Sequence, residues 1–316
     1  MRELIRKVPI PTAGVALGLA ALGNLLKPLL DPLHHVFGLI ALLLIGLVAA
    51  KAILFPSLIR EDLRNSVLAS VSATFFMTLM QIATYLASFA LGAAFALWVA
   101  AVIGHLVLMT WFTFTFIRRF KLSEVFPTYF ICYVGIIVAS ATAPAFGAQG
   151  IGYGLFWLGF ACYLVLLVVV TYRYAKHEVP EGARPLFCIY TAPMSLSLVG
   201  YLACAPAPNM LFVGILFVAA QLLYVIVLTR LPKFLALDFY PSFAAMTFPF
   251  VITATALGQV TELFRAAAMP FVTALEWLAL GETMVACLMV AFVLGHYVRF
   301  LFARPRAVEV ETEAEA

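Results

Sequence analysis

The sequence predicts an all-α membrane protein with ten transmembrane helices arranged as five helical hairpins. Of its 316 residues, 65% are hydrophobic and only 11% are charged, whereas soluble domains carry about 25% charged residues. A soluble fold of this length cannot hide so many apolar side chains. Apolar runs of about 20 residues, the length of one spanning helix, recur between short polar stretches. Runs such as 155–171 do not alternate apolar and polar residues, which favours helices over transmembrane strands.

The ten helices form one transmembrane domain, residues 11–301, between a cytoplasmic N-terminus, residues 1–10, and an acidic, disordered tail, residues 302–316. The last helix exceeds one perpendicular span, so its first turns are expected in the outer interface or beyond it. The expected helices are 11–30, 33–55, 67–89, 92–117, 126–147, 152–173, 184–204, 209–230, 241–261 and 272–301.

The positive charges predict the orientation of these helices. All but two of the 19 Lys and Arg residues fall at the N-terminus, in every second loop, or after the last helix. Only Lys27 and Arg265 fall on the other side. Because cytoplasmic loops are enriched in Lys and Arg, we expect a multi-pass protein of the cell (inner or plasma) membrane with both termini cytoplasmic. Short outer connections, about 147–152 and 205–208, predict antiparallel hairpins.

No motif for a cofactor, a metal or a catalytic centre occurs in the sequence. The HExxH, GxSxG and phosphate-loop patterns are missing, so neither an enzyme nor an ATP-driven pump is expected. The net charge of +4 reflects membrane topology, and no nucleic-acid partner is predicted. Without a CxxC pair, the five cysteines are interpreted as reduced packing residues. They are Cys132, Cys162, Cys188, Cys204 and Cys287.

The first helix of each hairpin differs from the second. The second helices are plainly apolar and suit lipid contact, whereas the first helices carry small, hydroxyl and proline residues. Residues 185–193 and 241–249 share Pro, Phe, Thr and Pro at a constant offset of 56. Pro144, Pro193 and Pro249 are expected to kink their helices. This contrast predicts an inner ring of first helices around a central pore, although small and hydroxyl residues also serve simple close packing.

Two motifs show a resemblance to a known family. The stretch PIPTAGVALGLAALGNLL at 9–26 resembles the first helix of the bacterial tellurite-resistance and dicarboxylate transporter family, and MTFPF at 246–250 resembles the ninth helix of plant slow-type anion channels of the same superfamily. The resemblance implies a homotrimer in the bilayer, with a separate pore in each protomer. It also implies transport of small anions such as chloride, nitrate, malate or sulfite. The anion assignment comes from this resemblance and not from composition.

The resemblance further implies a phenylalanine that plugs the pore at mid-membrane, and the matching position is Phe248. An aromatic ring in a narrow apolar pore blocks ions by excluding water. Phe75, Phe76 and Phe146 are candidates for a second gate. Each of these phenylalanines can instead be an ordinary packing residue.

Hydroxyl groups on the first helices are candidates for lining the pore. They could donate hydrogen bonds to a passing anion, or each could bond a carbonyl one turn earlier in its own helix. Weak neutral donors would bind an anion loosely and release it fast, as conduction requires. The candidates are Ser72, Thr142, Thr191, Ser195 and Thr247.

Ionisable residues within apolar segments are few. Glu282 and His105 are the candidate proton sites, although a packed histidine and an acid near the outer interface are the plainer interpretations. Three functions therefore stand open: a passive anion channel, a proton-coupled carrier or exporter of dicarboxylate or sulfite, and, more distantly, a membrane-embedded enzyme. A flux assay under an imposed pH gradient separates the first two.

Overall fold

A computed structural model describes residues 2–302, and within that range the chain forms helices joined by short turns, without strands. Eight helical stretches are long and apolar enough to cross a membrane, and two further apolar helices, Thr12–Leu26 and Ile137–Phe146, are shorter. The chain is therefore an all-helical, multi-pass membrane protein. The predicted tail 302–316 lies, except for its first residue, outside the described residues.

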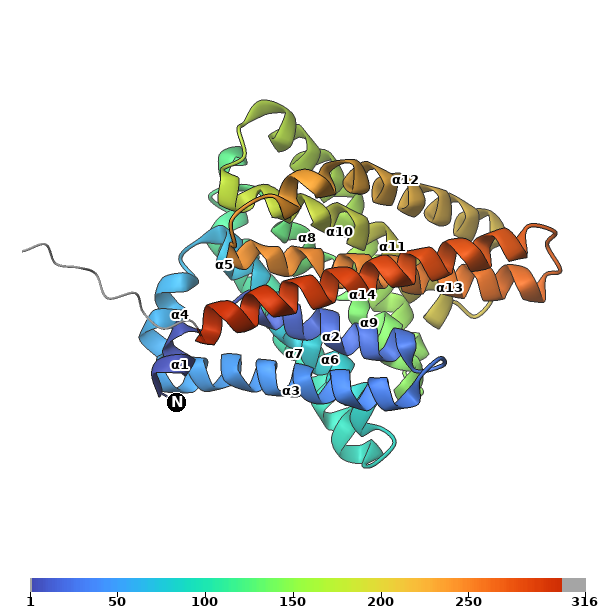
Figure 1. Ribbon diagram of the computed structural model, residues 1–316, viewed down its shortest axis with the longest axis horizontal. Coiled ribbons are helices and arrows are strands. Elements are labelled where there is room, and N and C mark those ends of the chain that lie inside the picture. The colour runs from blue at the N-terminus through green and yellow to red at the C-terminus, as the bar shows by residue number, and fades with distance from the viewer. Residues whose placement is uncertain (1, 303–316) are drawn as a thin grey trace, which may run out of the picture.

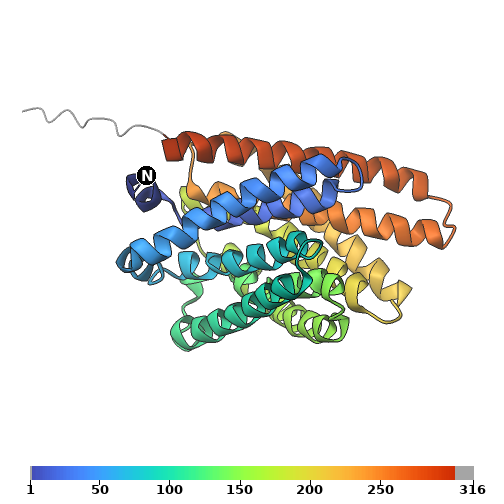
Figure 2. The same cartoon turned by 90° about the horizontal axis from the view of Figure 1, so that it is seen from below.

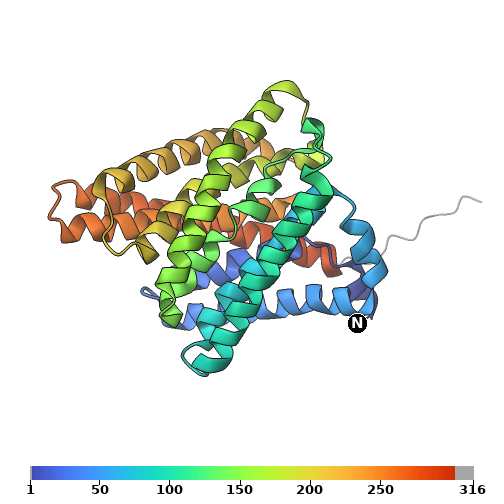
Figure 3. The same ribbon diagram turned by 180° about the vertical axis from the view of Figure 1, so that it is seen from behind.

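Five long helices form the outside of the bundle. Their most apolar stretches are only 28 to 33% buried, and their exposed surface consists of large aliphatic and aromatic side chains that suit lipid contact. Figure 1 shows α14 crossing one side of the molecule, and Figure 3 shows α7 and α10 crossing the opposite side. These helices are α3 (Asp31–Leu54), α7 (Leu91–Phe112), α10 (Gln149–Lys176), α12 (Met210–Leu235) and α14 (Val272–Phe302).

Five other segments form the inside. The apolar stretches of three of them are 61 to 83% buried, and α2 is buried at all positions except Asn24 and Leu25. Each inner segment precedes an outer helix and packs against it. The inner segments are α2 (Thr12–Leu26); α5 (Ser66–Val71) with α6 (Ala73–Leu86); α8 (Thr128–Tyr133), α9 (Ile137–Thr142) and η3 (Ala143–Phe146); η4 (Glu181–Tyr190) with α11 (Thr191–Cys204); and η5 (Pro241–Met246) with α13 (Phe248–Ala266).

The inner segments contact one another in a closed order. Helix α2 packs against α6, α6 against α9, α9 against α11, α11 against α13, and α13 returns to α2. Figure 2 shows the pair α13 and α14 beside the pair α2 and α3, which closes the order from the last hairpin to the first. Segments far apart in sequence are thereby brought around one axis.

Four of the five inner segments are interrupted part of the way along. The offset-56 repeat corresponds to two 3-10 segments, η4 and η5, that lead into α11 and α13. The three prolines expected to kink helix interiors lie instead in the first turn of a new segment: Pro144 in η3, Pro193 in α11 and Pro249 in α13. A proline there sacrifices little helical hydrogen bonding. The interruption before α13 falls at Thr247, whose φ of −106° and ψ of −89° are not helical.

Three short helical segments were not expected from the sequence. Helix α1 (Arg2–Lys7), helix α4 (Pro56–Asp62) and the 3-10 turn η2 (Leu122–Glu124) are too short and too polar to show as apolar runs. The π-helical turn η1 (Thr113–Ile117) continues α7 and lies within the expected helix 92–117. Helix α1 contacts α14, and Figure 1 shows the N-terminal end and the end of α14 on the same side of the molecule. Two chain ends on the same side of the molecule are what an even number of membrane crossings produces.

Candidate functional site

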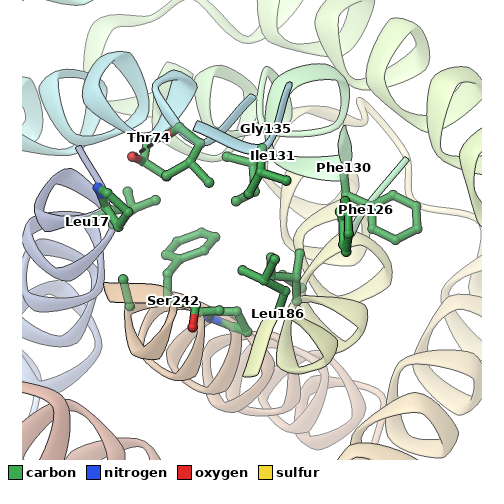
Figure 4. Close-up of a pocket in the computed structure, with 18 of the residues that line it drawn as sticks. Leu17, Thr74, Phe126, Phe130, Ile131, Gly135, Leu186 and Ser242 are labelled. Carbon is green, nitrogen blue, oxygen red and sulfur yellow. Dashed lines mark hydrogen bonds between the residues drawn. The ribbon is translucent and has the colours of Figure 1, made fainter. Parts of the chain in front are cut away.

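A cavity of about 450 Å³ lies on the axis of the inner segments. Its wall receives residues from all five inner segments and from none of the five outer helices. Figure 4 shows side chains from different segments surrounding an open centre. The residues labelled there are Leu17, Thr74, Phe126, Phe130, Ile131, Gly135, Leu186 and Ser242.

The cavity opens at the N-terminal ends of the inner segments and closes about halfway along them. At one end its wall includes the exposed Asn65 and the half-buried Gly182 and Ser242. At the other end it reaches buried residues, among them Met77 and Phe248. The cavity is therefore a one-ended vestibule whose closed end lies inside the bundle.

The wall of the vestibule is apolar and carries no charged side chain among its lining residues. Only Asn65, Thr74 and Ser242 contribute polar side chains, and the Thr74 hydroxyl already donates a hydrogen bond to the Val71 carbonyl at 2.7 Å. Several other lining residues are glycine or alanine, whose small side chains leave the vestibule open. A neutral wall of this kind holds a solute weakly, as conduction requires.

Phe248 lies at the closed end of the vestibule and is only 4% exposed. Its position is set by its neighbour Thr247, whose hydroxyl donates to the Ala244 carbonyl at 2.7 Å and to the Gly14 carbonyl of α2 at 3.1 Å. Helix α2 can approach this closely because Gly18 has no side chain: a Cβ there would lie 2.5 Å from the Cβ of Thr247 and 3.0 Å from the Phe248 nitrogen. The interruption before α13 is thus anchored to α2.

The hydroxyl candidates for lining the pore lie outside the wall of this vestibule. Each donates to a carbonyl three or four residues earlier, which is the alternative that the sequence left open. Thr142 also accepts from the Trp98 indole at 2.8 Å, and Ser195 lies 3.0 Å from the Thr253 hydroxyl. Their role toward an anion stays a prediction. The residues concerned are Ser72, Thr142, Thr191, Ser195 and Thr247.

The second-gate candidates also lie away from the vestibule wall. Phe75 and Phe76 are half-buried, and the Phe76 ring sits directly over Gly104 of α7, where an added Cβ would lie 2.3 Å from it. Phe146 packs on Phe95 and Trp98, with ring centroids 6.0 Å and 5.6 Å apart. Their contacts are those of packing residues.

The two candidate proton sites have different surroundings. His105 is fully buried, and its Nε2 donates to the Cys132 carbonyl at 2.8 Å, beside the interruption between α8 and α9. This contact fits the packed, hydrogen-bonded histidine. Glu282 on α14 is 3% exposed and lies beside the Gln221 side chain of α12, although neither carboxyl oxygen makes a hydrogen bond of ordinary geometry within the described chain. Neither residue lines the vestibule.

Arg173, which the sequence presented only as a topology charge, is a buried cation beside the vestibule. It is 2% exposed, and its guanidinium lies 4.1 Å from the ring centroid of Phe126, a residue of the vestibule wall. Its Nη2 donates to the Ser123 carbonyl at 3.3 Å, while Nε and Nη1 have no partner among residues 2–302. No carboxylate of the described residues forms an ion pair with it. Nothing in the local sequence distinguishes it from the neighbouring exposed Lys176.

A helical bundle in which five inner segments enclose an apolar vestibule defines the class of membrane channels and transporters. A family model described as voltage-dependent anion channel, SLAC1, matches residues 7–298. The chain belongs to this family, which confirms the resemblance found in the first and ninth predicted helices. It is a family of anion channels and transporters. A comparison with curated proteins finds no match.

Proposed function

We propose that this protein is an anion channel that passes chloride, nitrate or similar small anions through a pore in each protomer. In this proposal ten helices cross the membrane as five hairpins, the inner segments line the pore, and the vestibule is its cytoplasmic half. The observation that carries the proposal is the vestibule itself, because all five inner segments and no outer helix contribute to its wall. Both termini and the mouth of the vestibule then face the cytoplasm, and the protomers assemble as trimers.

The closed end supports Phe248 as the gate. An ion that passes Phe248 meets an aromatic ring instead of water. The loss of its hydration shell raises the free-energy barrier to permeation. The bond from Thr247 to the Gly14 carbonyl fixes the backbone next to the ring. The side chain therefore has to move, or the gate has to be opened elsewhere, before ions pass.

The first prediction concerns Phe248→Ala, which removes the ring from the closed end. A fall of about 1.4 kcal/mol in the barrier raises the rate about tenfold, and we expect at least this increase in chloride conductance of the purified protein in planar bilayers. Phe89→Ala and Phe114→Ala, which remove the same side chain from exposed positions outside the vestibule wall, serve as controls and should conduct like the parent. Equal conductance of Phe248→Ala and parent would show that Phe248 is not the gate.

Arg173 supports the preference for anions. A buried cation without an anionic partner costs several kcal/mol, and stacking on Phe126 returns only about 0.5–2 kcal/mol. At an effective dielectric constant near 20, unit charges about 10 Å apart interact by roughly 1.7 kcal/mol. That attraction raises anion occupancy in a wall that is otherwise neutral.

The second prediction concerns Arg173→Met, which removes the charge but keeps an unbranched side chain. In the Phe248→Ala background, we expect anion conductance to fall several-fold and the reversal potential in a salt gradient to shift toward weaker anion selectivity. Arg173→Lys should retain most of the selectivity. Arg119→Met, at an exposed position, is the matched control. Unchanged selectivity in a folded Arg173→Met protein would contradict the electrostatic role.

One observation favours a second candidate function, a proton-coupled carrier of malate or sulfite. The Glu282 carboxyl is buried beside the Gln221 side chain of α12, and neither its oxygens nor the neighbouring Tyr224 hydroxyl makes a hydrogen bond of ordinary geometry within the described residues. A buried acid with free oxygens within an apolar helix is a site that can exchange a proton. The two functions differ in whether protons move with the anion.

The third prediction separates them by uptake into liposomes under an imposed pH gradient. A channel gives anion uptake that follows the anion gradient and the membrane potential, and it moves no protons. A carrier gives uptake that the pH gradient drives, and Glu282→Gln should abolish this coupling. Glu276→Gln is the matched control, because Glu276 lies on the same helix but is exposed and paired with Arg265 at 2.7 Å. Proton movement that accompanies the anion would reject the channel proposal.

A further inference from the structure

A second pocket lies at the end of the bundle that carries the mouth of the vestibule. It has a volume of about 510 Å³ and lies where α10 ends, η4 begins and α12 ends. Three cations line it, and all are exposed. The other lining residues are aromatic or aliphatic. The full set is Tyr174, Val179, Arg184, Phe187, Arg230, Lys233 and Phe234.

The cations of this pocket are not neutralised by nearby acids. Arg184 has one carboxylate neighbour, Glu181, at 3.8 Å, and Glu181 also accepts a hydrogen bond from Tyr240. Arg230 and Lys233 form no ion pair with any carboxylate of residues 2–302. An excess of positive charge therefore converges on one hollow from two different elements.

The rest of the wall of the pocket is aromatic. The ring of Tyr174 lies 5.9 Å from that of Phe187, which in turn lies 6.3 Å from that of Phe234. The pocket thus combines exposed cationic donors and an aromatic wall. These are the groups that bind a phosphate with an apolar substituent.

The surroundings of the pocket point to a lipid rather than a soluble anion. Leu222 and Ile226 precede Arg230 at intervals of four residues on α12, so all three lie on one face of the helix. Leu222 and Ile226 are 61% and 50% exposed. This face leads from the apolar exterior of the bundle to the cations of the pocket. A lipid bound here would place its acyl chain along α12 and its headgroup phosphate beside Arg230.

We propose that this pocket binds the phosphate headgroup of an anionic membrane lipid, with Arg230 and Lys233 as the donors. The site is separate from the vestibule, since the two share no lining residue. It lies on the side that the proposed orientation assigns to the cytoplasm, where polybasic segments meet anionic lipids. The inference does not depend on whether the protein is a channel or a carrier.

The test measures lipid binding to the full-length protein in detergent by native mass spectrometry. The probes are short-chain phosphatidylglycerol, phosphatidylcholine of equal chain length and inorganic phosphate. Arg230→Gln/Lys233→Gln should weaken phosphatidylglycerol binding by about 30-fold, because each basic residue near a membrane surface contributes roughly fivefold. Arg118→Gln/Arg119→Gln removes the same charge from exposed positions outside the pocket and should have no effect.

Each other outcome overturns the proposal in a recognisable way. If inorganic phosphate displaces phosphatidylglycerol at equal concentration, the pocket is a site for soluble anions. If both double variants weaken phosphatidylglycerol binding equally, the lipid is attracted by the overall positive charge of this surface and not by the pocket. If phosphatidylcholine binds as tightly as phosphatidylglycerol, the headgroup charge is not recognised.

Discussion

The structure depends on satisfying backbone carbonyls inside a bundle that lipid surrounds. Interrupted helices leave carbonyls without their usual partners, and in a bilayer no water is at hand to satisfy them. His105 of α7 does so for the Cys132 carbonyl at 2.8 Å, near the end of α8. Hydroxyl groups also bind carbonyls of intact neighbouring helices: Thr78 of α6 donates to the Ala13 carbonyl at 3.0 Å, Thr247 to the Gly14 carbonyl at 3.1 Å, and Ser140 to the Gly152 carbonyl at 2.7 Å. These bonds connect the inner segments to one another and to the outer helices.

The same bonds explain why hydroxyl residues concentrate on the inner segments. The sequence left two interpretations open, donors for an anion and donors for a carbonyl. Ser195 and Thr142 make carbonyl bonds within their own helices and contact hydroxyl or indole groups of neighbouring segments. Most polar residues of the inner segments therefore build the ring, and the wall of the vestibule consists mainly of apolar residues. Because the vestibule wall is neutral, the proposed preference for anions requires a charge outside the wall. Arg173, which packs on the wall residue Phe126, is the cation to which we assign this role.

Hydrophobic length predicted the all-helical, multi-pass fold. The bounds of α7 and α14 agree with the expected helices to within a few residues, because long apolar runs with polar ends have one stable form in a bilayer. The interruptions were located less well. Pro249 suggested a kink in a helix interior, whereas the chain leaves the helical conformation at Thr247, before the proline. Sequence reasoning cannot weigh the contact with Gly18 of α2 that holds this residue, because 229 positions separate the two. Arg173 was missed for the same reason, since only the folded chain brings it to Phe126.

The central claim is that water and ions reach the closed end of the vestibule from the N-terminal ends of the inner segments. Single cysteines in a cysteine-free background test it directly, with a charged, membrane-impermeant thiol reagent added from the cytoplasmic side. Ala192→Cys and Ala245→Cys replace lining residues, whereas Ala254→Cys replaces a buried residue of α13 outside the wall. The account predicts that the first two react and the third does not. Protection of all three, or equal reaction of all three, would contradict it.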